Sequence, residues 1–212
     1  MPDDITAPKL ANWIHEFGHL VSVQRDRLNA LDAAIGDADH GTNLDRGFRA
    51  VTAELGTIPQ SDSATLLAHV GNTVISKVGG AAGPLFGTFF ILLGDAVGND
   101  RHLNNERFAL GLRAGLAGVV SRGRAEAGDK TMYDALAPAM GAFEEALASG
   151  VEPDVAARAA ADAAAAGRDA TEPMLALKGR ASYLGERSVG HVDPGAASSA
   201  LLLAALADTL ES

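Results

Sequence analysis

The sequence predicts an all-α protein, a single domain of about eight helices over residues 1–212. Apolar residues recur with the 3.6-residue period of an amphipathic helix, and no apolar–polar alternation is long enough to propose a strand. Hydrophobic residues make up 47% of the chain and aromatic residues only 5%, so the core must be built mainly from Ala, Leu and Val. This composition favours closely packed helices over sheets. No linker divides the chain.

The first predicted helix has an apolar face made of Leu10, Trp13, Ile14, Phe17, Leu20 and Val21, which Leu28 and Leu31 extend. Further helical stretches are predicted at about 44–55, 64–77, 84–97, 106–122, 133–148, 155–177 and 196–210. The segment 154–168 is rich in alanine, the best helix former, so a helix is expected there rather than disorder. The two long connectors, 123–131 and 178–195, are rich in Gly and polar residues.

The net charge of -10 argues against nucleic acid or an anionic membrane surface as a partner. The absence of cysteine excludes disulfides and thiolate metal sites. No signal peptide is evident, and the apolar run at 85–93 is shorter than the roughly 20 residues that span a bilayer. We therefore expect a soluble, cytoplasmic protein.

An acidic turn, LDAAIGDADHGTN, follows the first helix and carries Asp32, Asp37 and Asp39. Carboxylates this close repel one another unless a cation is bound, and oxygen ligands without Cys suit Mg²⁺ or Ca²⁺ rather than zinc. An EF-hand is excluded, because Thr42 and Phe48 stand where that loop needs a Gly and a bidentate acid. From spacing alone, ordinary turn and N-cap chemistry is an equal alternative.

Two further segments could bind an anion. His40-Gly41-Thr42-Asn43 opens a helix whose free N–H groups form an anion site. The loop 79–84 (GGAAGP) could present N–H groups to phosphate, or simply allow two helices to cross closely.

The turn 128–131 (GDKT), with Gly123 upstream, is similar to a Walker A loop. We reject a P-loop, because Asp129 is inserted before the Lys and no strand precedes it.

A zinc-protease pattern, H-E-x-x-H, occurs at 15–19 (HEFGH). His15 and His19 lie on the helix face opposite Phe17, and Ser22 stands where a metzincin has Gly. A solvated helix face explains the pattern, so the protease is only a minor hypothesis.

The segment 178–195 (KGRASYLGERSVGHVDPG) is dense in Gly and in charges of both signs. Arg180 and Arg187 are planar, bidentate donors suited to phosphate. A solvated loop held by pairs such as Glu186–Arg187 is the alternative, but so long a connector in a compact domain favours a functional role.

In chain order, the segments IGDADHGTN, GPLFGTFF, GDKTM and KGRASYLGERSVGH-DPGA resemble the nucleotide-binding L subunits of dihydroxyacetone kinases. With Asp32 they cover residues 32–196, and HEFGH falls outside them. The resemblance implies an α-helical barrel of eight antiparallel helices with ADP or ATP at one end. It also implies that Asp32, Asp37 and Asp39 bind two Mg²⁺ ions bridged to the nucleotide phosphates.

The implied nucleotide contacts are His40, Gly41, Thr42, Asn43, Ala81 and Ala82 at the phosphates, Gly123 and Met132 at the adenine, and Arg180, Val192, Asp193 and Pro194 closing the site. Arg180 is also the candidate catalytic residue, stabilising charge on the transferred phosphoryl group. Ala82 stands where the family commonly has Ser, which removes a hydroxyl but leaves the backbone N–H groups.

The implied activity is a phosphotransferase reaction that uses two partners. A K subunit holds dihydroxyacetone on its own histidine, and a phosphotransferase-system M subunit recharges bound ADP from phosphoenolpyruvate. The alternatives are an ATP-dependent kinase subunit for another triose or a tetrose, with exchangeable nucleotide, and a non-catalytic regulator that binds a transcription factor. A homodimer is a further partner hypothesis.

Overall fold

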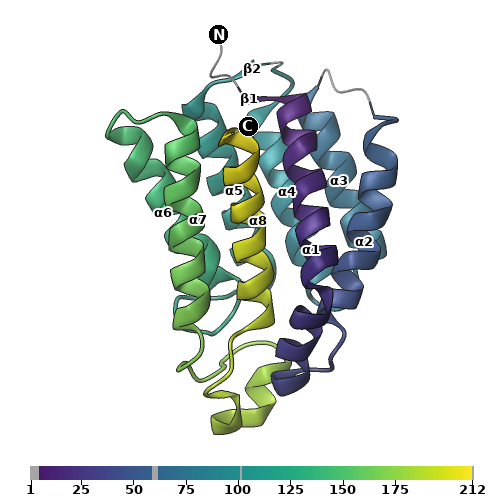
Figure 1. Ribbon diagram of the computed structural model, residues 1–212, viewed down its shortest axis with the longest axis vertical. Helices are drawn as coiled ribbons and strands as arrows, with labels where there is room; N and C mark the ends of the chain where they lie inside the picture. The colour runs from purple at the N-terminus through teal and green to yellow at the C-terminus, as the bar shows by residue number, and fades with distance from the viewer. Residues whose placement is uncertain (1–4, 59–61, 101, 212) are drawn as a thin grey trace.

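A computed structural model describes residues 5–58, 62–100 and 102–211, and the described chain is almost entirely helical (Figure 1). In chain order the elements are β1 (Ile5–Thr6), α1 (Ala7–Ile35), α2 (His40–Leu55), α3 (Ser63–Lys77), α4 (Ala82–Val97), β2 (His102–Leu103), α5 (Asn105–Gly123), α6 (Tyr133–Ala148), α7 (Pro153–Ala170), the 3-10 helix η1 (Arg180–Ser188) and α8 (Pro194–Glu211). The predicted all-α class is confirmed.

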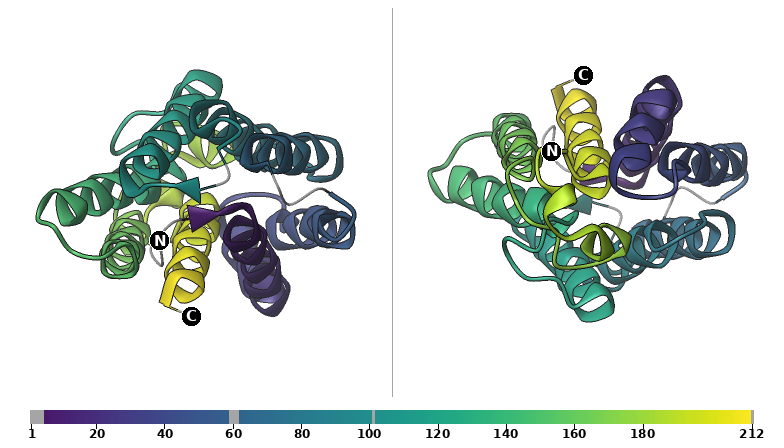
Figure 2. Two further views of the ribbon diagram at one scale, coloured as in Figure 1. Left: turned by 90° about the horizontal axis from the view of Figure 1, so that it is seen from above. Right: turned by 90° about the horizontal axis from the view of Figure 1, so that it is seen from below.

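The eight α-helices are arranged as a closed ring. Each contacts the next in the chain, and α8 closes the ring against α1 (Figure 2). Neighbours run in opposite directions, so α2, α4, α6 and α8 all begin at the same end, which η1 covers (Figure 1). The strand pair β1–β2 and the last turn of α8 lie at the other end (Figure 1). This order agrees with an α-helical barrel.

Aromatic side chains hold the ring together from inside. All seven phenylalanines are buried, and Phe17 contacts Phe48 edge-on with ring centroids 4.6 Å apart. Trp13 is also buried, and its Nε1 donates a hydrogen bond of 2.8 Å to the Leu202 carbonyl, which ties α1 to α8. Small residues line the α6–α7 contact, where a Cβ on Gly167 would lie 2.2 Å from the Asp134 carbonyl oxygen. The rings therefore fill the centre while Ala and Gly let α6 and α7 approach.

Three features differ from the sequence-based expectations. The helix expected at 155–177 ends at Ala170, where the Thr171 hydroxyl donates to the Arg168 carbonyl and Pro173 follows two residues later. The β1–β2 pair, with Ile5 opposite Leu103, is too short to produce a visible alternation. The expected connector 178–195 contains η1.

None of the described helices is both long enough and apolar enough to cross a bilayer.

Candidate functional site

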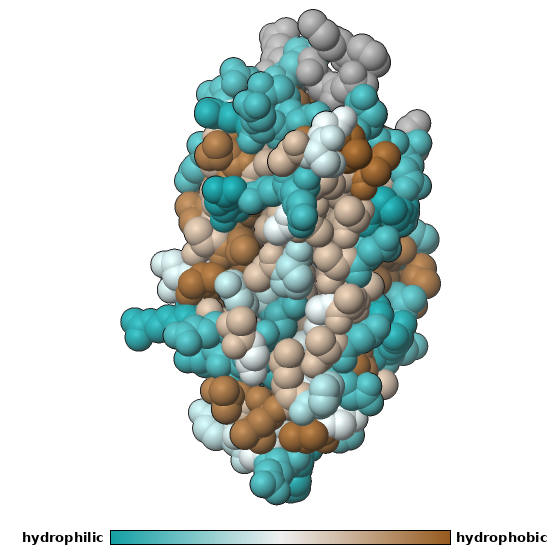
Figure 3. Space-filling view, turned by 90° about the vertical axis from the view of Figure 1, so that its left-hand side faces the viewer, coloured by the Kyte–Doolittle hydropathy of each residue, from teal (hydrophilic) through white to brown (hydrophobic). Residues whose placement is uncertain are grey.

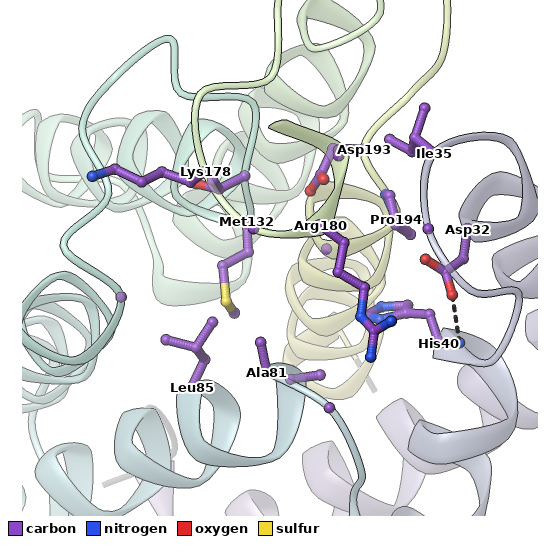
Figure 4. Close-up of a pocket in the computed structure, with 18 of the residues that line it drawn as sticks. Asp32, Ile35, His40, Ala81, Leu85, Met132, Lys178, Arg180, Asp193 and Pro194 are labelled. Atoms are coloured by element: carbon purple, nitrogen blue, oxygen red, sulfur yellow. Dashed lines mark hydrogen bonds between the residues drawn. The ribbon is translucent and has the colours of Figure 1, made fainter. Parts of the chain in front are cut away.

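A cavity of about 300 Å³ opens at the end of the ring that η1 covers (Figure 4). Its wall is formed by the α1–α2 turn, the start of α4, the end of α5 with the α5–α6 loop, and the segments 178–181 and 193–195. The first residues of α2, α4 and α8 (His40, Ala82 and Pro194) line it, and α6 begins directly after the lining residue Met132. Helix N-termini carry a partial positive charge, and the N-terminus of α4 has no side-chain cap. In α2, the N–H groups of His40 and Thr42 already donate to Asp32 and Asn29, so these two are not the free N–H groups expected from the sequence. The convergence of the helix N-termini creates a local site for an anion in a protein of net negative charge.

The acidic turn faces this cavity and is folded around Asp32. The Oδ2 atom of Asp32 accepts the backbone N–H groups of Asp39 (2.9 Å) and His40 (3.1 Å). The turn needs a left-handed residue, Ala38, whose φ is 64°. Carboxylate oxygens of Asp32, Asp37 and Asp39 lie within 4.8 Å of one another, with Asp32 buried and the other two exposed. An all-oxygen set with two exposed members fits a hard cation such as Mg²⁺ that also binds phosphate.

Arg180 is the cation that meets these carboxylates. Its Nη2 atom lies 3.0 Å from Asp37 Oδ2, and its side chain points from η1 toward the α2 start (Figure 4). Gly179, with φ of 66°, turns the chain just before it. The guanidinium is 69% exposed, so this ion pair is a weak and exchangeable one.

Asn43 and His40 reach the cavity from the first turn of α2. Arg46 Nη2 donates to Asn43 Oδ1 over 2.9 Å, which leaves the Asn43 amide NH₂ free to donate. His40 Nε2 lies 2.9 Å from Ser198 Oγ and so joins α2 to α8. Burial lowers the pKa of His40, although Asp32 and Asp39 act in the opposite direction.

Of the metal- and nucleotide-binding residues that the resemblance implies, all except three line this cavity. Those that do are Asp32, Asp37, Asp39, His40, Asn43, Ala81, Ala82, Gly123, Met132, Arg180, Asp193 and Pro194. Arg187, the second candidate phosphate donor, does not line the cavity. The structure places Gly41, Thr42 and Val192 elsewhere. A Cβ on Gly41 would lie 2.1 Å from the Arg25 carbonyl, and Thr42 exchanges hydrogen bonds with Asn29, so both face α1. Val192 is half-buried against the core.

An apolar wall, of which the sequence analysis named only Met132, lies opposite the charged end of the cavity. Leu85 and Phe86 come from α4, Val119 from α5, and Ala125 and Met132 from the α5–α6 loop and its end. Figure 4 shows Leu85 and Met132 side by side at this wall. A cavity with one apolar wall and one charged, N–H-rich end suits a flat base joined to phosphates.

Lys130 was named in the GDKT turn, but no role was predicted for it. It lines the cavity and is only 1% exposed, and its Nζ donates to the carbonyls of Glu172 (3.3 Å), Met174 (3.0 Å) and Ser188 (2.6 Å). Burial lowers the pKa of Lys130, while Asp193 and Glu172 raise it. These acceptors lie 42 to 58 residues away in the chain, so no local pattern could reveal them.

Asp193 caps α8 from inside the same end of the ring. Its Oδ2 accepts the Ala196 N–H over 2.7 Å, and its own N–H donates to Thr171 Oγ1 over 2.9 Å. Burial raises the pKa of Asp193 to about 7, with Asp134 acting in the same direction and the Ala196 N–H and Lys130 opposing it. The group therefore titrates near neutral pH.

The zinc-protease pattern has no third ligand in the part of the chain that the structure describes. His15 and His19 are exposed on α1, and the group Asp32, Asp37 and Asp39 is the one metal-like cluster among the described residues. The pattern is consistent with a solvated helix face.

Comparison with known proteins identifies the family. The DAK2 domain matches residues 34–208. The chain belongs to the DAK2 domain family. Among DAK2 proteins, it is 42% identical over 203 residues to the PEP-dependent dihydroxyacetone kinase, ADP-binding subunit DhaL, of Escherichia coli, covering 96% of this chain and 97% of that protein. It is 40% identical over 200 residues to the ADP-binding subunit DhaL of kinase 2 of Listeria innocua, covering 93% of this chain and 92% of that one.

A solved dihydroxyacetone kinase structure has the same fold. The crystal structure of the dihydroxyacetone kinase from C. freundii in complex with AMP-PNP and Mg²⁺ superposes with a TM-score of 0.70 at 31% identity. The match covers 93% of this DAK2 chain and 33% of that longer chain.

Proposed function

We propose that this protein is the nucleotide-binding L subunit of a dihydroxyacetone kinase. It would hold ADP or ATP with Mg²⁺ in the cavity and pass the γ-phosphoryl group to dihydroxyacetone bound on a separate K subunit. The observation that carries this proposal is the placement of three carboxylates beside converging helix N-termini at one end of a cavity with an apolar wall. The names of its DAK2 relatives support the substrate.

Asp32, Asp37 and Asp39 would hold two Mg²⁺ ions, which would neutralise charge on the phosphates. The protein itself would position these carboxylates and the phosphate donors. Asp32 keeps the turn closed through its two backbone hydrogen bonds, while Asp37 and Asp39 stay exposed toward the cavity. The Asn43 amide and the first N–H groups of α4, which has no side-chain cap, would donate to phosphate oxygens. Phosphoryl transfer needs this kind of positioning more than covalent help.

The adenine would lie on the apolar wall between Leu85 and Met132, near Gly123. Arg180, from the opposite side, would meet charge on the transferred phosphoryl group. No general base is required on this chain, because the hydroxyl that accepts the phosphoryl group would sit on the K subunit.

The K subunit would approach the end of the ring that bears the cavity. Four of the exposed large apolar side chains among the described residues lie there, namely Leu175, Leu177, Tyr183 and Val189. Figure 3 shows hydrophobic side chains gathered at that lower end of the molecule. Exposed apolar surface beside a site is typical of a docking surface for another protein.

The recharging step would use a phosphotransferase-system M subunit, with ADP remaining bound between cycles. The PEP-dependent naming of the E. coli and Listeria relatives supports this phosphate donor. The whole chain would act as one unit in the cytoplasm. A homodimer and binding to a transcriptional regulator remain predictions.

The deciding experiment is the nucleotide and metal content of the protein as purified, after gel filtration. Retained ADP, stoichiometric with the chain and accompanied by Mg²⁺, is the expected result. Nucleotide-free protein that turns over ATP beside a K subunit would favour the alternative kinase for another triose or a tetrose. Failure to bind either nucleotide in the presence of Mg²⁺ would refute the proposal.

A further inference from the structure

The segment 171–190, here called the cap, is tied to the α5–α6 loop through one buried ammonium group. The three N–H donors of Lys130 Nζ match three acceptors, all backbone carbonyls of the cap. Two of them, on Glu172 and Met174, lie near the start of the cap, and the third, on Ser188, lies near its end. The Gly190 N–H also donates to the Glu172 carbonyl over 2.8 Å and so joins the two ends of the cap directly. Lys130 adds the link from both ends to the cavity wall.

Lys130 holds this position at a physical cost. A charged group that is 1% exposed loses its hydration, and the structure pairs it with neutral carbonyls rather than with a contacting carboxylate. Its backbone also lies in the left-handed region, with φ of 62°, which disfavours a side chain of this size. Strain and a buried charge at one residue of a cavity wall indicate a positioning role.

The rest of the cap is organised around the same point. Ser188 Oγ accepts the Ala176 N–H over 2.9 Å and donates to the Gly185 carbonyl over 2.7 Å. The Leu177 N–H donates to the Asp129 carbonyl, next to Lys130, over 3.1 Å. Between these anchors the chain carries residues 178–181 to the cavity, where Arg180 reaches Asp37. Loss of the ammonium would leave the Met174 and Ser188 carbonyls without their donor, while the Glu172 carbonyl would keep the Gly190 N–H (2.8 Å). The unmatched carbonyls would favour release of this segment.

We propose that Lys130 is a positioning residue that latches the cap over the nucleotide, so that residues 178–181 cover the cavity and Arg180 faces the acidic turn. The inference rests on the proposed function in one respect, namely that the covered ligand is a nucleotide. A closed cap would slow the release of ADP and hold Arg180 at the acidic turn. Lys130 itself need not touch the reacting atoms.

The primary test compares wild type with Lys130→Met by limited trypsin digestion and by the rate of ADP dissociation. Trypsin suits this test because Lys178, Arg180 and Arg187 all lie in the cap. We expect cleavage at these three sites to become at least about ten-fold faster, and ADP release to accelerate by a similar factor. Equal cleavage and equal ADP release in the two proteins would overturn the proposal. Faster cleavage spread over the whole chain would indicate general destabilisation and would also overturn it.

A chemical rescue separates the ammonium from the rest of the side chain. The protein contains no cysteine, so Lys130→Cys introduces a unique thiol. Alkylation of the unfolded variant with 2-bromoethylamine, followed by refolding, gives an aminoethyl-cysteine with an ammonium at the length of lysine. Iodoacetamide gives a neutral side chain of similar size. We expect the first derivative alone to regain a resistant cap and slow ADP release, and equal behaviour of the two would overturn the proposal. Lys9→Cys, on α1 at the far end of the ring, is the matched control.

A second variant tests the cap without changing Lys130. Ser188→Ala removes the hydroxyl that accepts the Ala176 N–H and should loosen the cap to a smaller extent. If its cap becomes sensitive to trypsin while ADP release is unchanged, cap order does not control retention and the inference fails. If wild type binds no nucleotide, the proposed function fails instead, and the trypsin comparison still reports whether Lys130 holds the cap.

Discussion

Arg180 and Asp37 meet across the mouth of the cavity, with Nη2 and Oδ2 3.0 Å apart, and so connect the cap to the α1–α2 turn. Asp37 would use the same oxygens to bind Mg²⁺, so the arginine and the cation compete for them. Arrival of a Mg²⁺–nucleotide is therefore expected to free the guanidinium for phosphate. We propose that this exchange would bring Arg180 within reach of the transferred group.

The first prediction concerns the metal ligands. Asp37→Ala should abolish retention of ADP, because the two remaining carboxylates cannot hold both cations and the charge of the phosphates is then no longer offset. Nucleotide absorbance and metal analysis of the gel-filtered variant measure this. Asp26→Ala, which removes an 81% exposed carboxylate on α1, is the control and should keep a normal ADP content. A normal ADP content in Asp37→Ala would contradict the metal site.

The second prediction separates binding from transfer. Arg180→Ala should retain ADP but slow phosphoryl transfer to the K subunit by about a hundred-fold or more. Single-turnover transfer from the ATP-loaded subunit, beside a nucleotide dissociation assay, measures the two quantities. Arg187→Ala, an exposed arginine of the same cap, should leave both unchanged. An equal loss of binding and transfer in Arg180→Ala would make it a binding residue only.

The third prediction is a pH dependence of stability. The folded pKa of Asp193 is about 7, above the 3.8 of an unperturbed aspartate, so the folded state binds a proton that the unfolded state has released. The contribution of Asp193 to the free energy of unfolding is therefore fully present below pH 3.8, and it is lost as the pH rises toward about 7. The variant Asp193→Asn can still cap α8 but cannot ionise, so its free energy of unfolding should not show this decrease with rising pH.

Urea unfolding at several pH values between 5 and 8, in EDTA and without nucleotide, measures that effect. The free energy of unfolding of Asp193→Asn relative to wild type should rise by up to about 1.4 kcal/mol per pH unit until Asp193 is ionised. Asp162→Asn, at an exposed position on α7, should show no such trend. Parallel pH profiles for Asp193→Asn and wild type would disprove the assignment.

The fourth prediction uses one substitution at two glycines. A Cβ on Gly41 would lie 2.1 Å from the Arg25 backbone carbonyl, so Gly41→Ala must push the start of α2 away from α1. We expect a loss of about 1–3 kcal/mol of unfolding free energy and weaker ADP binding. Gly141→Ala, in α6 with no atom within 4 Å of the new Cβ, should instead stabilise the protein by about 0.5–1 kcal/mol. Thermal and urea unfolding measure both, and the same sign at both positions would refute the argument.

The fifth prediction addresses the apolar surface of the cap. Leu177→Ser, at a position 56% exposed, should weaken binding to the K subunit while leaving the ADP content unchanged. Leu110→Ser, at a position 55% exposed on α5, is the control. Titration calorimetry with the K subunit measures the difference. Equal affinities of the two variants would place the docking surface elsewhere.

Local sequence predicted the acidic turn well, because Asp32, Asp37 and Asp39 are close in the chain and one short turn brings them together. It could not tell which of the four residues that follow, 40–43, face the cavity. Successive residues of a helix point in directions about 100° apart, so Gly41 and Thr42 face α1 while His40 and Asn43 face the cavity. Only part of a contiguous motif at the start of a helix therefore lines the cavity.

Long-range features escaped prediction for a different reason. The acceptors of Lys130 are backbone carbonyls, which every residue carries, so their positions have no signature in residue type. The apolar wall was hidden in the same way, because the periodic apolar residues of α4 and α5 look alike whether they face the core or the cavity. Only the assembled ring distinguishes them.

The β1–β2 pair and the last turn of α8 lie at the end of the ring away from the cavity. Since α8 has 18 residues, an attachment at that end would stand roughly 27 Å from the cavity. The protein could thus be immobilised on a sensor surface with its open mouth presented to solution. Encounters with a soluble partner could then be recorded directly, without chemical labelling near the nucleotide.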